Sequence, residues 1–198
     1  MESNNFWKHK TAEIEKGANI GQGTKIWNNC QIKKNATIGE NCVVGHNCFI
    51  SSKAVMGKGC KLQSNIDVWD EVTLEDYIFV GPSVVFTNDL NPRAKYPKSK
   101  YPKYGEWIPT LVKEGATLGA NATIICGINI GKWAMVGAGS VVTKDVSDYA
   151  IVVGSPAKNI GWICECGNKI KFEDEQTICK ICEKRYQKEE EKVWEIKK

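Results

Sequence analysis

Hydrophobic residues recur at every sixth position over most of this chain. The period holds for 13 consecutive positions from Ile14 to Phe86, and it resumes for six more from Val112 to Val142. With 42% hydrophobic residues, these 19 matches have a chance probability of roughly one in ten million. An α-helix repeats every 3.6 residues and a simple strand every two, so neither element explains a strict period of six.

A chain that turns a corner every six residues does explain it. Three such segments close one triangular coil of 18 residues, and the sixth-position aliphatic side chains point inward and stack at the strand spacing of about 4.8 Å. Glycine often follows the inward aliphatic residue, where a corner needs positive φ or close backbone approach. We therefore predict a mainly β protein, a parallel β-helix, whose corner glycines are Gly21, Gly39, Gly45, Gly81, Gly119, Gly131 and Gly137.

A second inward position lies two residues before each aliphatic residue, and it is small throughout. Its occupants are Ala18, Thr24, Cys30, Ala36, Cys42, Cys48, Ala54, Cys60, Ala116, Ala122, Ala134 and Ser140. Four of the nine cysteines fall here. We expect these four to act as small buried hydrophobic residues and not as metal ligands or redox groups.

Residues 87–111 interrupt the period. A segment of this length inside a regular solenoid is typical of a functional loop, and its tyrosines and Trp107 argue against plain disorder. We predict a loop that folds over a neighbouring surface, with a tolerated insertion as the alternative.

If the loop leaves at one corner and re-enters at the next, one edge of the prism stacks the corner segments 45–47, 63–65, 81–83, 119–121 and 137–139. Asn47 and Asn65 then lie one coil apart, next to Gln63. Such an asparagine ladder has two interpretations: a structural hydrogen-bond stack, or amides presented to a sugar or a phosphate.

The repeat [LIV]-Gly-x-x-x-x resembles that of the left-handed parallel β-helix acyltransferases, over residues 9 to about 163. The left-handed sense is taken from this resemblance. Four segments are similar to sugar N-acetyltransferases of this family, namely 86–93, 110–124, 136–142 and Val153-Gly154-Ser155-Pro156-Ala157-Lys158.

The resemblance implies transfer of an acetyl group from acetyl-CoA to the 3-amino group of a nucleotide-linked sugar. The implied sugar is UDP-2-acetamido-3-amino-2,3-dideoxyglucuronate, used in surface-polysaccharide or glycan assembly. A close variant acts on a dTDP-linked 3-amino-3,6-dideoxyhexose. Composition does not separate the two nucleotides or the two sugars, although the chain length and the cysteine tail favour the uronate.

An amine acceptor fits the small number of histidines. Relatives that acetylate a hydroxyl need a histidine as general base, but an amine near neutral pH supplies its own lone pair after losing a proton to solvent. The loop has no histidine, and the chain has only His9 and His46. The resemblance implies that Asn88 holds or polarises the acceptor. His46 is the reserve base, with a corner histidine bonded to backbone as the alternative.

For acetyl-CoA the resemblance implies a groove between adjacent subunits of a homotrimer. Pantetheine would run along backbone amides, and the 3′-phosphate would meet a lysine that is otherwise an ordinary solvated charge. The residues expected there are Gly119, Ala120, Gly137, Ala138, Lys144 and Lys158. In the acceptor site Arg93, the only arginine of the loop, can meet the sugar carboxylate or the pyrophosphate as a fork.

After the repeat stops, two cysteine pairs follow with the spacing C-x-C-x12-C-x2-C. They are Cys164, Cys166, Cys179 and Cys182. Two paired-cysteine corners on a hairpin are typical of a small zinc ribbon, with four free thiols or one disulfide as alternatives. We divide the chain into a β-helix domain over 1–160 and a ribbon-like tail over 161–198.

Composition excludes several other classes. A net charge of +4 without a basic block does not indicate nucleic-acid binding. The sequence has no run of 18 apolar residues, so no membrane span is predicted. The start of the chain lacks the apolar stretch of a secretory signal, and nine cysteines do not form a full disulfide set, so we expect a cytoplasmic protein. A carbonic-anhydrase-like zinc β-helix needs three histidines, and a purely structural solenoid leaves the loop without a purpose.

Overall fold

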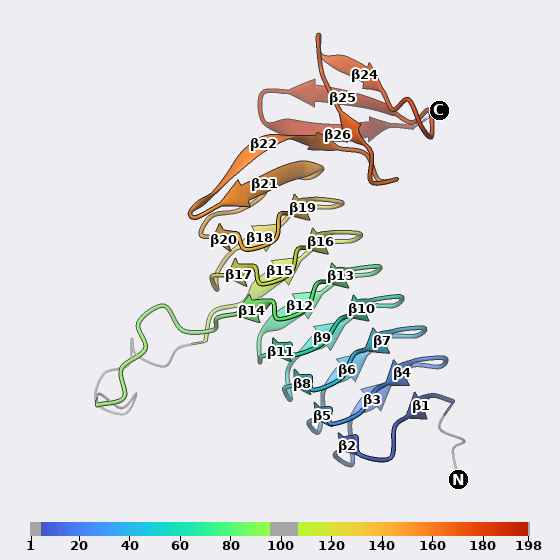
Figure 1. The fold of residues 1–198 in the computed structure, drawn as a ribbon, viewed down its shortest axis with the longest axis vertical. Coiled ribbons are helices and arrows are strands. Elements are labelled where there is room, and N and C mark those ends of the chain that lie inside the picture. Colours follow the sequence, from blue (N-terminus) through green and yellow to red (C-terminus); the bar gives the residue numbers. More distant parts are fainter. Residues whose placement is uncertain (1–4, 96–106, 198) are drawn as a thin grey trace.

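The computed structural model describes residues 5–95 and 107–197, which form a solenoid of short parallel strands with a small antiparallel sheet at its C-terminal end (Figure 1). Each coil contributes one strand to each of three sheets that run along the solenoid. The described ranges contain no helix, so they contain none that is long and apolar enough to cross a membrane. The predicted three-faced β-helix is confirmed, and its left-handed sense stays a prediction.

Sheet A carries one face of the prism and continues into the C-terminal hairpin. Its strands, in spatial order, are β1 (Trp7–Lys8), β4 (Lys25–Ile26), β7 (Val43–Val44), β10 (Lys61–Leu62), β13 (Phe79–Val80), β16 (Thr117–Leu118), β19 (Met135–Val136), β21 (Ala150–Gly154), β22 (Ala157–Ile163) and β23 (Lys169–Ile170). Val80 pairs with Leu118 across the interruption, as the sequence predicted.

Sheets B and C carry the other two faces. Sheet B contains β2 (Glu13–Ile14), β5 (Gln31–Ile32), β8 (Phe49–Ile50), β11 (Asp67–Val68), β14 (Val85–Phe86), β17 (Thr123–Ile124) and β20 (Val141–Val142). Sheet C contains β3 (Asn19–Ile20), β6 (Thr37–Ile38), β9 (Val55–Met56), β12 (Val72–Leu74), β15 (Thr110–Val112) and β18 (Asn129–Ile130).

The interior is as narrow as the small second inward position predicted. The aliphatic side chains of sheet A, such as Val44 and Leu62, are completely buried. The thiols of Cys30, Cys42, Cys48 and Cys60 are buried too, and each donates to a backbone carbonyl 15 residues further on, at 2.8 to 3.2 Å. The expectation that these cysteines fill the core is confirmed.

The corners use two different devices. The glycine after the inward aliphatic residue is needed for close approach: a Cβ on Gly39 would lie 2.5 Å from the backbone of Gly57 in the next coil. The positive φ falls two residues later. On the edge between sheets A and B that position is held by Asn29, Asn47, Asn65, Ser83, Asn121 and Gly139, with φ between 56° and 68°. Asparagine and glycine are the residues that adopt this conformation at least cost.

The loop replaces one corner, between β14 in sheet B and β15 in sheet C. It spans 87–109 and not 87–111 as predicted, because Thr110 and Leu111 already pair with Val72 and Thr73. The loop is anchored at its base, where Ile108 N donates to Asn88 O at 3.0 Å and Cys126 N donates to Thr87 Oγ1 at 2.9 Å. Figure 1 shows the described part of the loop that follows β14 running away from the body of the solenoid.

The C-terminal segment covers the end of the solenoid. Strands β22 and β23 extend sheet A, so the predicted boundary at residue 160 falls within β22. A separate sheet D follows, made of β24 (Gln176–Ile178), β25 (Arg185–Glu189) and β26 (Lys192–Ile196). Tyr186 of β25 is completely buried, and its ring packs against Tyr149 of the last coil at 5.2 Å between centroids. The segment therefore shares the hydrophobic core of the coils.

Candidate functional site

The corner between sheets A and B, here called the A–B edge, carries the predicted asparagine ladder. It consists of the segments 45–47, 63–65, 81–83, 119–121 and 137–139, stacked coil on coil. Asn47 Nδ2 donates to Asn65 Oδ1 at 2.9 Å. Both residues also hold the left-handed backbone conformation, so the ladder has a structural role, while its role in binding stays a prediction.

His46 lies on the same edge and has a side-chain partner that the sequence analysis missed. Ser64, which is 18 residues later and so one coil further on, places its Oγ 2.7 Å from His46 Nδ1. The predicted alternative of a histidine ring bonded to backbone is not what is found. A ring held through Nδ1 leaves Nε2 as the nitrogen that can meet a ligand.

A shallow pocket of about 200 Å³ opens beside His46. Its lining residues are Trp27, Asn28, Val43, Gly45, His46, Leu62, Gln63 and Ser64. Trp27 is 46% exposed, and it supplies an aromatic face at the rim. The predicted substrate residue Gln63 thus lies at the pocket, whereas Trp27 was not predicted as a site residue.

Four residues predicted for acetyl-CoA follow on the A–B edge, toward the C-terminus. Gly119 N donates to Val136 O and Gly137 N donates to Val152 O, both at 2.8 Å, so the two glycine corners stack directly. The spacing is tight, since a Cβ on Gly119 would lie 2.5 Å from Ala138 N. Gly119, Ala120, Gly137 and Ala138 thus form a strip of small residues, here called the glycine strip. Lys158, which pairs with Val153 in the β21–β22 hairpin, is exposed near the end of this strip.

Three other predicted residues lie on another edge, between sheets B and C, here called the B–C edge. Asn88 and Arg93 follow β14, and Lys144 follows β20. The side chain of Asn88 is half-buried and makes no hydrogen bond to any other residue in the described ranges. Arg93 is exposed, and its Nη1 donates to Pro92 O at 2.8 Å.

One chain therefore does not bring the predicted site residues together. His46, Asn47, Gln63 and the glycine strip share the A–B edge, whereas Asn88 and Arg93 lie on the B–C edge. A pocket that uses both sets needs the B–C edge of one chain beside the A–B edge of another. Residues 96–106 of the loop lie outside the described residues.

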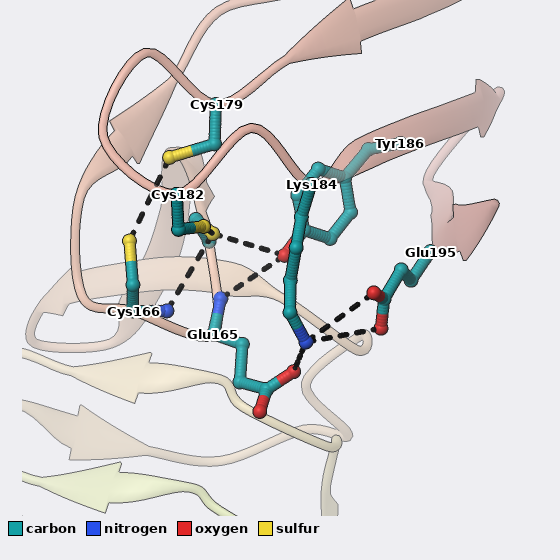
Figure 2. Close-up of polar contacts among 8 residues, drawn as sticks. Glu165, Cys166, Cys179, Cys182, Lys184, Tyr186 and Glu195 are labelled. Carbon is teal, nitrogen blue, oxygen red and sulfur yellow. Dashed lines mark hydrogen bonds and ion pairs between the residues drawn. The ribbon is translucent and has the colours of Figure 1, made fainter. Parts of the chain in front are cut away.

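At the C-terminal end the four predicted metal ligands converge (Figure 2). The Sγ atoms of Cys164, Cys166, Cys179 and Cys182 all lie within 4.8 Å of one another. Tyr186, which was not predicted, places its OH 3.0 Å from Cys164 Sγ. Lys184 pairs with Glu165 and Glu195 beside the cluster, and these carboxylates raise the pKa of its ammonium above the usual range.

Two repeat families match the chain. Residues 17–52 match the bacterial transferase hexapeptide family (six repeats), and residues 109–144 match the hexapeptide repeat of succinyl-transferase. Both matched ranges lie within the coils, on either side of the loop.

Among curated proteins, the dTDP-3-amino-3,6-dideoxy-alpha-D-galactopyranose 3-N-acetyltransferase of Aneurinibacillus thermoaerophilus is 54% identical over 77 residues, which make up 39% of this chain and 40% of that protein. The bifunctional protein GlmU of Fervidobacterium nodosum is 30% identical over 126 residues, or 63% of this chain and 25% of that protein. The alignments thus span less than half the length of these relatives.

Among solved structures, LpxA from Acinetobacter baumannii superposes with a TM-score of 0.52 at 18% identity, covering 78% of this chain and 74% of that one. This similarity concerns the fold of the coils.

Proposed function

Because the chain carries the hexapeptide repeats of bacterial transferases, we propose that it moves an acetyl group from acetyl-CoA to the amine of a nucleotide-linked amino sugar. The observation that carries this proposal is the 54% identity, over 77 residues, to an enzyme named for 3-N-acetylation of a dTDP-3-amino sugar. The absence of any histidine from the loop supports an amine acceptor over a hydroxyl.

In this proposal Asn88 binds the acceptor amine and the acetyl carbonyl region through its side-chain amide. That amide is unengaged within the described part of the chain, so it is available to a ligand. The free amine attacks the thioester carbon, the C–S bond breaks, and coenzyme A leaves as its thiol after taking up a proton. His46, oriented by Ser64, is the reserve acceptor for the proton that the amine loses.

Acetyl-CoA is proposed to lie along the glycine strip of the A–B edge. The backbone there is open to a ligand because no side chain beyond Cβ stands at Gly119, Ala120, Gly137 or Ala138. Lys158 at the end of the strip supplies a cation for the 3′-phosphate. Lys144 lies on the B–C edge, so it can serve only from a neighbouring chain.

A homotrimer is proposed to complete the site, with the loop of one chain meeting the A–B edge of the next. The separation of Asn88 from His46 on different edges supports this, since a threefold arrangement of prisms juxtaposes unlike edges. The nucleotide sugar would lie between the two chains and meet Asn47, Gln63 and Asn65 on one side and Arg93 on the other.

Two acceptors remain within the proposal. The sequence resemblance favours UDP-2-acetamido-3-amino-2,3-dideoxyglucuronate, whose carboxylate suits Arg93. The curated relative favours a dTDP-linked 3-amino-3,6-dideoxyhexose, which has no carboxylate.

A substrate panel tests both. The protein is incubated with acetyl-CoA and each of four acceptors. They are the UDP-3-amino uronate, the same sugar with a CH2OH group in place of the carboxylate, the dTDP-3-amino-3,6-dideoxyhexose and the 3-hydroxy form of the uronate. Mass spectrometry then follows the gain of one acetyl group. We expect product from a 3-amino sugar and none from the 3-hydroxy form. If no 3-amino sugar is acetylated, or if the hydroxy form reacts equally well, the proposed activity is wrong.

A further inference from the structure

The four cysteines of the C-terminal end are arranged as a metal site, independently of acetyl transfer. Cys164 Sγ lies 3.3 Å from Cys182 Sγ, and Cys166 Sγ lies 3.6 Å from Cys179 Sγ. Thiolates around one zinc ion, with Zn–S bonds of about 2.3 Å in a tetrahedron, stand about 3.8 Å apart. A disulfide needs about 2.05 Å, so the spacing found suits a shared ion and not two bridges.

The backbone around the two cysteine pairs repeats one device. The residue after the second cysteine of each pair has positive φ, namely Gly167 at 86° and Glu183 at 61°. Each chain turn closes on itself, with Gly167 N donating to Cys164 O at 2.8 Å and Glu183 N to Cys179 O at 2.9 Å. The first turn closes over three residues and the second over four, and each presents two thiols to one centre, as in four-cysteine zinc sites.

Donors also surround the sulfur atoms. Cys166 N points to Cys164 Sγ at 3.5 Å, Asn168 Nδ2 to Cys179 Sγ at 3.8 Å, and the Tyr186 hydroxyl lies 3.0 Å from Cys164 Sγ. Hydrogen bonds from the surroundings hold metal ligands in place and offset the charge on thiolates.

The cluster joins two parts of the molecule. Cys164 and Cys166 follow β22, which belongs to sheet A of the solenoid, whereas Cys179 and Cys182 follow β24 of sheet D. Figure 2 shows Lys184 reaching from the second turn to Glu165 on the first and to Glu195 on β26. An ion at this centre would therefore fasten sheet D across the last coil, where Tyr186 packs on Tyr149.

We propose that Cys164, Cys166, Cys179 and Cys182 bind one Zn²⁺ per chain, and that this ion holds sheet D as a cap on the open end of the β-solenoid. A solenoid needs such an end piece because its last coil otherwise leaves its core and strand edges uncovered. The ion acts structurally, since four protein thiolates leave no open coordination position.

The first test is metal analysis of the full chain, purified under reducing conditions without chelator. We expect about one equivalent of zinc per chain, and after exchange a Co²⁺ form with the absorption of a tetrahedral thiolate site. Less than roughly half an equivalent after incubation with Zn²⁺, or a count of titratable thiols that shows two disulfides, would overturn the proposal.

Two variants separate this site from the other cysteines. The double variant Cys179→Ser/Cys182→Ser should lose the zinc. The control Cys60→Ala should keep it, since Cys60 is buried in the coils and Ala116 and Ala134 occupy the same inward position in later coils. Zinc retained by the double variant, or lost equally by the control, contradicts the assignment.

Hydrogen exchange tests the role of the ion as a clamp. In the double variant, amides of β24 to β26 should exchange roughly tenfold faster or more, while those of β4 to β14 are unchanged. The coils serve as the internal reference for folding. Unchanged exchange in sheet D of zinc-free protein would refute the capping role.

Discussion

Asn88 is the residue on which the proposed chemistry depends most. It stands at the base of the loop, where its carbonyl accepts from Ile108 N, so its backbone is fixed while its side-chain amide has no partner in the described part of the chain. A rigidly placed and unengaged amide can aim a hydrogen bond at a substrate without reorganisation.

Replacing Asn88 with alanine should therefore lower turnover by roughly 10²-fold, which is the scale for losing one aimed donor in an active site. The backbone bond from Ile108 N is retained, so the free energy of unfolding should stay within about 0.5 kcal/mol of the original. Steady-state acetylation together with urea denaturation checks both.

Asn91→Ala is the matched control. Asn91 lies three residues further on the same loop segment, and its N–H is held by Asp89 Oδ1 at 2.7 Å, a bond that survives the change. Turnover should be unaffected. Equal losses in the two variants would remove Asn88 from the site.

His46→Asn should have a smaller effect, below about tenfold, because an amine acceptor needs no strong base, whereas an essential general base contributes roughly 10² to 10⁴-fold. Asparagine also preserves a polar contact with Ser64. The acidic limb of kcat/KM should stay in place, since it belongs to deprotonation of the acceptor amine. A loss of 10²-fold, or a displaced acidic limb, would make His46 the base.

Residue identities were predictable where geometry forces them. The inward cysteines and the Asn47–Asn65 ladder followed from counting six and 18 along the chain. The His46–Ser64 contact obeys the same spacing of 18, but a single pair has no periodic signal to mark it. Tyr186 of β25 lies beside Cys164, 22 residues earlier and outside the six-residue repeat, so no spacing rule applied.

At the scale of elements, the corners divide close approach and positive φ between two positions. Gly39→Ala should lower the free energy of unfolding by about 1–3 kcal/mol. The new Cβ would press on the backbone of the next coil, and neither coil can move without disturbing the stack.

Gly139→Asn should be nearly neutral, within about 0.5 kcal/mol. Its φ of 68° is the conformation that asparagine adopts at the same corner in earlier coils, and nothing lies within 4 Å of a Cβ there. Denaturant unfolding of both variants gives the comparison. If Gly139→Asn costs as much as Gly39→Ala, close approach does not distinguish the two corner positions, and the division of roles is wrong.

The period of six also explains which strands the sequence did not reveal. Val146 bridges to Ile130 and Val152 pairs with Val136, each 16 residues later and not 18. The last coil is thus two residues shorter than the others, so a search for hydrophobic residues at every sixth position does not detect it. At the other end Lys8 pairs with Ile26 although it is not apolar, because the first coil leaves that position open to solvent.

At the scale of the whole molecule, the arrangement of edges predicts assembly. Asn88 and Arg93 stand on a different edge of the prism from the glycine strip, so the proposed site needs two chains. Sedimentation at micromolar concentration should give a trimer. A monomer that still acetylates would contradict the shared site.

Subunit mixing tests the shared site most directly. Asn88→Ala impairs the loop side, and Ala120→Trp, whose indole would fill the glycine strip, blocks the A–B edge; each alone should keep at most about one hundredth of the original activity. Trimers assembled from equal amounts of both should regain about one quarter of the original activity, because three quarters of random trimers are mixed and each mixed trimer has one intact junction of three. Mixed trimers, verified by mass, that remain as inactive as the parent variants would show that each chain builds its site alone and would contradict the account.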